Sequence, residues 1–562
     1  MVKGDGAMTA NTLRPFVVIS ISYLLFTVTD GAIRMIVLLH AYNAGFSAMQ
    51  VATMFTLYEL AGVVTNLVAG FAGARLGIKC TLLTGLTLQL VSYGMLFAWP
   101  AIFDDSSTFM GGDGFCASQA SLIAYVTVAQ MFGGIAKDLT KLGGKTVTKL
   151  VTPSDKSTRL FKLVSLLTGW KNSLKGVGYF AGSALVAVQY ELALAVMMGL
   201  IVLALPVAAF GLDGNLGTAR KENVKWSDVF ITHNPNLNWL SLARCFLFAS
   251  RDFWFEVPLP FFLRAPGCAG LGTSTCLATA DCGAGALCVN ASSGHLPVVC
   301  GGRDDGVQGL AALGLDAASV CVSMNAGGGC GGLGWERVVV GAILGSYIIL
   351  YGQIQSYTPQ LVTGPLGQTP PNKLTEVLWG LINCIPTAAM AAVAYSLPMR
   401  ADGANDVAFT VALMAMVVTF ALIFAVNSSI HSFLVVHYAK KDKVAQSVGF
   451  YYMSNAAGRL LGTLGSGVIY TYAGESHGAY AGSDARSGLA ACLVAGTLSS
   501  LVAALITLKI NDDAAGLRCG PLLCVRGSES PSEKPAKKGG KDSTDTAPPA
   551  QMQGIEVTSS ST

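Results

Sequence analysis

Long apolar stretches recur twelve times along the 562-residue chain and constrain its fold more than any other feature. A helix needs about 20 mainly apolar residues to cross a bilayer. The stretches lie near 16–39, 49–71, 80–101, 118–137, 161–188, 191–211, 237–263, 336–359, 375–397, 407–432, 446–473 and 487–509. Only 12% of the residues are charged, against about 25% in soluble domains. The sequence therefore predicts an all-α membrane protein with 12 transmembrane helices.

Basic residues gather in alternate connections between these stretches and orient the predicted helices. The connections after the second, fourth, sixth and tenth stretches include Arg75, Lys79, Lys141, Lys145, Lys149, Arg220, Lys221, Lys440 and Lys441. The connection after the third stretch is instead acidic, with Asp104, Asp105 and Asp113. Because short cytosolic loops carry the excess of Lys and Arg, we expect both termini in the cytosol and the protein in the plasma membrane.

The predicted helices form two groups of six. Residues 1–15 precede the first half at 16–211, and a polar, basic cytosolic linker at 212–236 leads to the second half at 237–509. Two such halves are typical of the major facilitator superfamily fold. The segment 70–79 resembles that superfamily's loop motif, with Ala74 where an aspartate is usual. We expect a monomer in the lipid bilayer that binds no nucleic acid.

An insert at 265–334, on the predicted extracellular side, holds half of the chain's fourteen cysteines. They are Cys268, Cys276, Cys282, Cys288, Cys300, Cys321 and Cys330. Their spacing lacks the paired C-x2-C steps of a zinc site, and an oxidising compartment favours disulfides. The insert therefore predicts a disulfide module and no metal site. The odd cysteine either pairs with Cys116 or stays a free thiol.

Two further segments carry predictions of their own. The sequence Asn290-Ala-Ser292 in the insert is an N-glycosylation motif, which predicts a sugar on Asn290. The tail at 510–562 is rich in Ser, Pro, Lys and Gly, a composition that buries too little apolar surface to fold. We expect this tail to be a disordered cytosolic segment.

Charged residues inside the predicted helices carry the main functional signal. Each charge near the middle of a membrane helix costs about 2.5–3.5 kcal/mol on insertion scales, and such residues usually face the bundle interior. The basic members are Arg34, Lys137, Lys171, Lys175, Arg244, Arg251 and Arg459, and the acidic members are Asp30, Glu59, Asp138, Asp252 and Glu256. Because the cations outnumber the acids, we predict that they bind an anionic substrate together with Asn455.

The spacing of these charged residues along the sequence indicates which of them share a helix face. Lys171 and Lys175 are four residues apart, so their ammonium groups lie on one helix face. Such like charges repel unless an anion lies between them or carboxylates on neighbouring helices neutralise them, and the sequence leaves both arrangements open. Asp30 and Arg34 are also four residues apart, which favours an ion pair within their helix.

The sequence leaves the driving force of transport open. Proton coupling needs a titrating group, for which Glu59, Asp252, Glu256 and His431 are candidates. Uniport is the alternative, since each exported negative charge gains about 2.3 kcal/mol per 100 mV. The chain has no P-loop, G-x-S-x-G or H-E-x-x-H motif in a usable context, so we predict no enzyme, catalytic residue or cofactor.

Several strings in these helices resemble one facilitator family, the organoarsenical-efflux proteins of bacterial arsenic-resistance operons. The strings cover 29–35, 133–139, 167–178, 248–254, 427–432 and 449–459. This resemblance, which spans about 14–509, implies efflux of 1-arseno-3-phosphoglycerate and hence arsenate resistance. It also implies a functional link to glyceraldehyde-3-phosphate dehydrogenase, which forms that compound when arsenate replaces phosphate. The alternatives are a transporter of organophosphate or phosphate, or a receptor that kept the fold.

Overall fold

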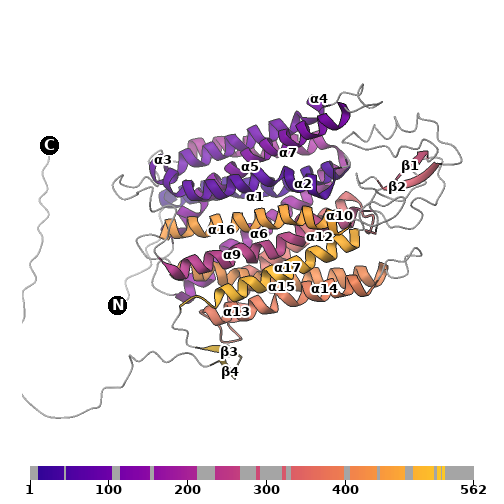
Figure 1. Ribbon diagram of the computed structural model, residues 1–562. Coiled ribbons are helices and arrows are strands. Elements are labelled where there is room, and N and C mark those ends of the chain that lie inside the picture. Colours follow the sequence, from indigo (N-terminus) through magenta and orange to yellow (C-terminus); the bar gives the residue numbers. More distant parts are fainter. Residues whose placement is uncertain are drawn as a thin grey trace, which may run out of the picture.

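The protein is a bundle of long helices that lie side by side (Figure 1). The computed structural model describes residues 10–43, 46–103, 114–151, 157–211, 234–265, 286–290, 319–323, 331–397, 406–438, 444–474, 485–511, 516–520 and 522–525. The first half forms α1 (Ala10–Asn43), α2 (Ala48–Met54), α3 (Thr56–Phe97), α4 (Trp99–Phe103), α5 (Gly114–Val151), α6 (Ser157–Val188) and α7 (Tyr190–Gly211).

The second half repeats this all-helical pattern. Its elements are α9 (Pro235–Phe255), α10 (Pro258–Arg264), α12 (Arg337–Thr358), the π-helical turn η5 (Pro359–Thr363), α13 (Lys373–Ile382), α14 (Cys384–Ser396), α15 (Asp406–Tyr438), α16 (Val444–Ala473) and α17 (Ala485–Thr507). Between the halves, the described part of the predicted linker consists of residues 234–236. There Asn234 caps α9, since its side-chain oxygen accepts a hydrogen bond from the backbone N–H of Asn236 at 3.1 Å.

Within the described residues, nine segments are long and apolar enough to span a membrane. The predicted spans missing from these nine are 161–188, 237–263 and 446–473, which nevertheless form α6, α9 with α10, and α16. These are the helices that carry Lys171, Lys175, Arg251 and Arg459, so their charges explain their lower apolarity. The prediction of an all-α fold is confirmed.

The boundary between the second and third predicted spans differs from the expectation. We expected a loop at 72–79, but α3 runs as one helix over both spans, Ala48–Val68 (with α2) and Lys79–Phe97. The 42-residue α3 contains no proline to interrupt it, and its glycines are tolerated within a helix. Helical backbone therefore extends through the basic segment that we took for a connection.

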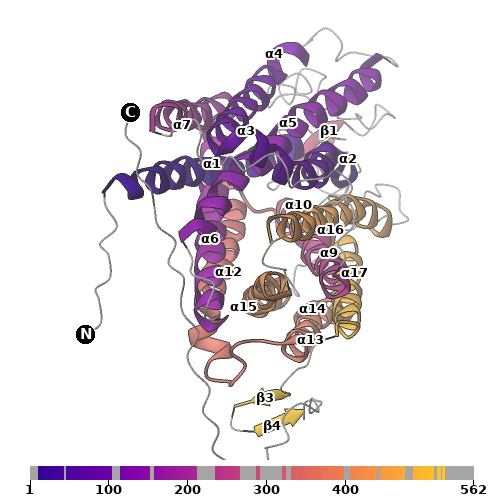
Figure 2. The same ribbon diagram turned by 90° about the vertical axis from the view of Figure 1, so that its left-hand side faces the viewer.

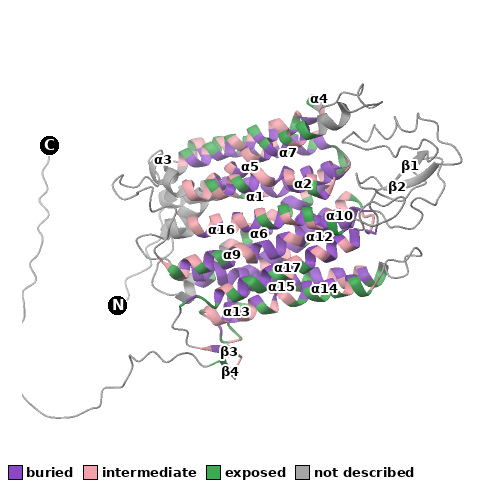
Figure 3. Ribbon diagram, in the orientation of Figure 1, coloured by how far each residue is buried: buried purple, intermediate pink, exposed green. Residues whose placement is uncertain are grey.

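Exposed residues lie on the outward faces of the bundle and buried residues between the helices (Figure 3). Many of the exposed side chains are large and apolar. Phe210 is 84% exposed, Val407 75% and Leu203 64%. Water disfavours apolar surface of this extent, whereas hydrocarbon does not. Together with the nine spans, these faces identify an integral membrane protein.

The two halves meet closely where α6 lies beside α12 (Figure 2). A Cβ atom added to Gly169 of α6 would lie 2.2 Å from the carbonyl oxygen of Gly352 on α12. Asn172 donates a hydrogen bond to Gln355 across the same contact, at 2.7 Å. Small residues allow membrane helices to approach in this way, so the contact depends on the missing side chains.

Gly169→Ala is therefore expected to destabilise the protein by about 1–3 kcal/mol, because the methyl group has to push two backbones apart. Thermal unfolding of the purified protein in detergent measures the effect. Gly199→Ala on α7 is the matched control, since a Cβ there meets no atom within 4 Å. An unfolding temperature for Gly169→Ala equal to that of the control would contradict the close contact.

Short strands lie at opposite ends of the helices (Figure 1). At one end β1 (Ala286–Asn290) pairs antiparallel with β2 (Ser319–Ser323), and Cys288 is opposite Cys321. The predicted disulfides, the Cys116 alternative and the side chain of Asn290 lie outside the described residues, so these stay predictions. At the other end, β3 (Leu517–Cys519) pairs with β4 (Leu522–Val525).

The strands β3 and β4 overturn part of the predicted disorder at 510–562. Their hairpin is attached to the loop before α13, because Gln368 donates to the carbonyl of Arg518 at 2.8 Å and Asn372 to that of Gly516 at 2.9 Å. Apolar Leu517 is buried there. The expectation averaged composition over the whole tail, and this average hid a short apolar segment. Residues 526–562 lie outside the described part of the chain.

Candidate functional site

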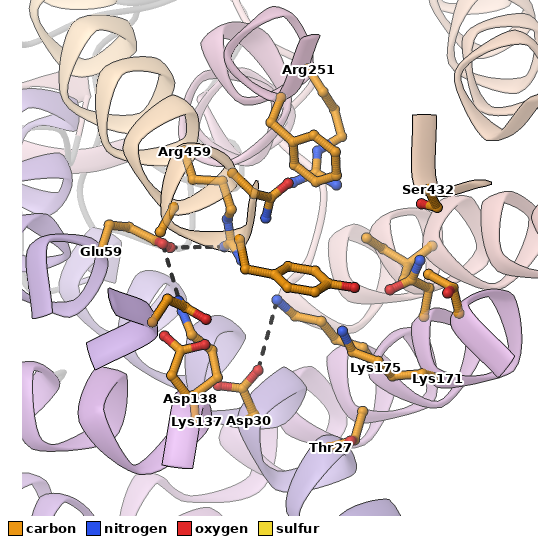
Figure 4. Close-up of a pocket in the computed structure, with 18 of the residues that line it drawn as sticks. Thr27, Asp30, Glu59, Lys137, Asp138, Lys171, Lys175, Arg251, Ser432 and Arg459 are labelled. Atoms are coloured by element: carbon orange, nitrogen blue, oxygen red, sulfur yellow. Dashed lines mark ion pairs between the residues drawn. The ribbon is translucent and has the colours of Figure 1, made fainter. Parts of the chain in front are cut away.

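A pocket lies between the two halves and is lined by side chains from α1, α3, α5, α6, α9, α12, α15 and α16 (Figure 4). Its cavity volume, counted as space that the centre of a water molecule can reach, is about 100 Å³. One water needs about 10–15 Å³ by this measure, so the pocket suits a small polar solute rather than a polymer.

The described residues that line this pocket include ten charged side chains. Six are basic and four are acidic: Lys137, Lys171, Lys175, Arg244, Arg251 and Arg459 against Asp30, Glu59, Asp138 and Glu256. These ten residues therefore carry a formal excess of two positive charges. Asn455 lines the pocket as well. Seven of the eight residues predicted to bind substrate thus meet in one place, and Arg34 is the exception.

Arg34 lies deeper in the protein, where it joins three helices. Its Nη1 atom is 2.8 Å from Glu256 Oε2 on α9, and its Nη2 atom is 2.7 Å from Glu59 Oε1 on α3. The guanidinium also lies 4.9 Å from the centre of the Phe55 ring. Arg34 thus pairs with two buried carboxylates, which it shares with other cations. This arrangement suits a structural role better than substrate contact.

Glu59 is shared among cations from three other helices. Besides Arg34 of α1, it approaches Arg459 of α16 at 2.9 Å and Lys137 of α5 at 3.6 Å. Its side chain is almost fully buried. One carboxylate thus holds basic groups from both halves at the pocket, as the dashed lines of Figure 4 show for Lys137 and Arg459.

Arg251 and Arg459 meet the acids of α9. Arg251 Nη2 is 2.5 Å from Asp252 Oδ1 and 3.5 Å from Glu256 Oε1. Arg459 Nη2 is 3.3 Å from the same Glu256 oxygen, and its Nε atom is 3.4 Å from Asp252 Oδ2. The two carboxylates, four residues apart, thus hold both guanidinium groups at one wall of the pocket.

Asp30 does not form the predicted pair with Arg34 of its own helix. Tyr58 donates a hydrogen bond to Asp30 Oδ1, and Lys175 Nζ lies 3.9 Å from Asp30 Oδ2. Spacing of four residues puts both side chains on one face of α1, but Arg34 finds closer carboxylates on other helices. Asp30 therefore lies in the part of the pocket that Lys175 and Lys171 also line (Figure 4).

Arg244 differs from the other arginines because its partners are neutral. Its Nε atom donates to Asn455 Oδ1 at 3.3 Å, and its Nη1 atom to Ser428 Oγ at 3.2 Å. The guanidinium lies 4.0 Å from the centre of the Phe248 ring. Among the described residues no carboxylate oxygen lies within 4.0 Å of its nitrogens, so part of the pocket's positive charge resides here.

No protein-family model and no curated protein sequence matches the chain. Several solved structures do match the chain. A bacterial homologue of the iron transporter ferroportin, in an outward-facing state, matches 88% of this chain and 99% of its own with a TM-score of 0.55 and 10% identity. A point mutant of the nucleoside transporter NupG matches 89% and 100%, with 0.53 and 11%. This chain has the major facilitator fold.

A third solved structure adds to this finding. The human organic anion transporter MFSD10 (TETRAN) matches 87% of this chain and 98% of its own length, with a TM-score of 0.51 and 12% identity. Identities this low show the fold alone. What this chain binds therefore has to be argued from its own pocket.

The pocket lies nearer to one end of the helices than to the other. Its lining residues lie in the middle of the helices and toward the β3–β4 end, as do Tyr23 on α1 and Tyr452 on α16. Toward the β1–β2 end, buried aromatic side chains fill the space. Tyr42 packs against Phe261 with ring centres 5.0 Å apart, and Phe261 against Tyr470 at 6.3 Å. Among the described residues, the pocket therefore lies nearer to the β3–β4 end of the helices than to the β1–β2 end.

Among the coupling candidates, Glu59, Asp252 and Glu256 belong to the pocket network and His431 does not. His431 Nε2 lies 2.8 Å from Glu376 Oε1, between α15 and α13. Glu376 was not among the predicted residues, because an acid in the first turn of a helix is usually a solvated helix-end residue. Tyr58 was not among the predicted residues either, because spacing rules within one helix cannot place Tyr58 of α3 beside Asp30 of α1.

Proposed function

We propose that this protein transports a small, multiply charged organic anion across a membrane by alternating access. The observation that carries the proposal is the excess of two positive charges among the ten charged residues of a pocket between the halves. A net charge away from water is costly unless it is matched, and an anion matches it. The same site has arginines, whose planar fork suits phosphate-like oxyanions.

The distribution of these cations suits a molecule with two charged ends. Lys171 and Lys175 project from α6, whereas Arg251 and Arg459 come from helices of the other half (Figure 4). An anion that contacts both groups bridges the halves. Closure around the anion then replaces some of the carboxylate contacts, which makes the conformational change depend on the substrate.

We propose 1-arseno-3-phosphoglycerate as the cargo, because the strings that resemble the organoarsenical-efflux family are the ones that supply the pocket. The string 133–139 contributes Lys137, 167–178 contributes Lys171 and Lys175, and 449–459 contributes Arg459. The compound has a phosphate ester at one end and an acyl arsenate, a mixed anhydride, at the other. Glyceraldehyde-3-phosphate dehydrogenase would supply it in the cell.

Export is the direction we propose, and it rests on the predicted topology. With both termini cytosolic, the β3–β4 end, near which the pocket lies, faces the cytosol. An anion that binds there and leaves outside moves with a negative-inside potential, which favours each exported negative charge by about 2.3 kcal/mol per 100 mV. Arsenate resistance follows, because the labile arsenate group of the exported compound hydrolyses outside the cell.

The decisive test uses inside-out vesicles that contain the protein, supplied with the dehydrogenase, its substrates and arsenate. We expect arsenic to accumulate in the lumen only when the enzyme and arsenate are both present. Vesicles without the protein are the control. Equal accumulation of the phosphorylated product with phosphate in place of arsenate would favour an organophosphate carrier. Absence of flux with both anions would reject transport and favour a receptor.

A further inference from the structure

Besides the charged pocket, the C-terminal half contains a buried pair of polar side chains, a histidine and a glutamate. His431 on α15 and Glu376 on α13 are 0% and 2% exposed, and Nε2 approaches Oε1 to 2.8 Å. Among the described residues, neither imidazole nitrogen has a partner in hydrogen-bonding geometry. Neither side chain lines the pocket. A titratable pair buried at this depth is costly to maintain, and the anion site does not account for it.

Residues next to this pair along α13 and α15 belong to a buried apolar cluster. Ile430, Phe433 and Leu434 of α15 pack with Leu237 and Leu240 of α9 in one buried cluster, and Trp379 of α13 packs against it. A pair that carries a proton is neutral overall, as acid with imidazole or as carboxylate with imidazolium. Without that proton it has a net negative charge. In apolar surroundings the second state costs more, so the two states favour different exposure to water.

The charged and titratable groups around the pair come from several helices. On α15 itself, Asn427 donates to Glu376 Oε2 at 3.0 Å when its amide nitrogen faces the carboxylate. Tyr451 of α16 packs in the same cluster, with its ring centre 5.0 Å from the guanidinium carbon of Arg244 on α9. Lys373, three residues before Glu376 on α13, donates to the carbonyl of Ile510 at 2.7 Å. On α12 two polar side chains reach α15: the Tyr351 hydroxyl lies 3.2 Å and Gln355 Nε2 3.3 Å from Ser428 Oγ.

One short segment of α15 connects the pair to the anion pocket. Asn427 and His431 are four residues apart and face Glu376, whereas Ser428 and Ser432 form the adjacent face. Ser428 accepts the hydrogen bond of Arg244, and Ser432 lines the pocket. A rotation or shift of α15 that exposes His431 to water therefore also moves two groups at the anion site.

We propose that His431 and Glu376 form a proton-binding site that takes up a proton from water on one side of the membrane and releases it on the other in each transport cycle. This inference rests on the proposed anion transport. The proton travels opposite to the anion: it enters the pair from outside and leaves to the cytosol while the anion is exported. The pair thereby couples a pH gradient to export.

The test adds a pH gradient to the inside-out vesicles, whose lumen corresponds to the outside of the cell. For an exchange of one proton per anion, a lumen one pH unit more acidic raises wild-type accumulation up to about tenfold. We expect Glu376→Gln and His431→Gln each to abolish this pH dependence while exchange of anion without a gradient continues. His437→Gln is the matched control, because His437 lies on the same helix but is exposed. It should keep the wild-type dependence.

A pH dependence that survives in both variants, or that is absent from a wild-type protein that exchanges anions, would overturn the inference and leave the transport proposal intact. If the wild type moves no anion, the transport proposal fails, and a substrate-free measurement still decides the proton site. NMR of protein labelled at its histidines should show a ring signal that titrates with pH, vanishes in His431→Gln and shifts its midpoint in Glu376→Gln. A His431 ring signal whose chemical shift stays constant between about pH 5 and 9 would overturn the proposed proton site.

Discussion

Replacement of Lys175 by alanine should reduce arsenate-dependent accumulation in inside-out vesicles by about thirtyfold or more, because loss of a buried charge contact costs at least about 2 kcal/mol of binding. The Lys175 ammonium group lies at the pocket, 3.9 Å from Asp30, and its side chain is 14% exposed. Membrane insertion should be unchanged, since Asp30 keeps its hydrogen bond from Tyr58.

Lys162→Ala controls for the loss of a lysine from the same helix. Lys162 lies on α6 as well, but it is exposed and does not line the pocket. Normal flux is expected there. Arg251→Ala should lose as much activity as Lys175→Ala, and Arg251→Lys most of it, because an ammonium group cannot reproduce the two-pronged guanidinium contact. Wild-type flux in Lys175→Ala and Arg251→Ala would remove both residues from the substrate site.

Loss of the Glu59 charge should lower stability more than any single lysine substitution in the pocket. Glu59→Gln leaves Arg34, Lys137 and Arg459 with one fewer counter-charge, and breaking a buried ion pair from one side costs about 3–5 kcal/mol. The unfolding temperature in detergent should fall, and so should the yield of folded protein. A second change, Lys137→Met, should recover part of the loss by removing one unmatched cation.

The matched control for this second prediction is Glu336→Gln, since Glu336 is exposed and its side chain makes no capping hydrogen bond to α12. Its unfolding temperature should equal that of the wild type. If Lys137→Met lowers the stability of Glu59→Gln further instead of restoring it, charge balance is not the reason for the Glu59 effect.

The sequence predicted which helices line the pocket but not how their charges pair. Apolar length located the spans, and the insertion cost of charges identified the residues that face inward. Pairing depends on contacts between helices far apart in sequence, such as Arg34 with Glu256, 222 residues away. Spacing rules act within one helix, so they suggested Asp30 with Arg34 and gave no indication of Tyr58 or Glu376.

The same limit applies at the ends of the chain. Averaged composition predicted disorder for 510–562, whereas a local apolar segment forms β3 and β4 there.

The number of charges in the helices led us to predict Arg34 as a substrate-binding residue, but in the structure two carboxylates hold it. Arg244 gains importance for the opposite reason, because the described residues offer it neutral partners.

The junction of the large insert bears on how such a chain can lengthen during evolution. The backbone N–H of Gly334 donates to the carbonyl of Ala265 at 2.8 Å, and that of Trp335 to the carbonyl of Leu263 at the same distance. The residues that flank the insert are therefore already joined without it. For a flexible segment, each doubling of length at such a closed junction adds only about 0.6 kcal/mol of entropy cost. Segments of very different lengths can therefore connect Ala265 with Gly334 while the helices on both sides keep their packing.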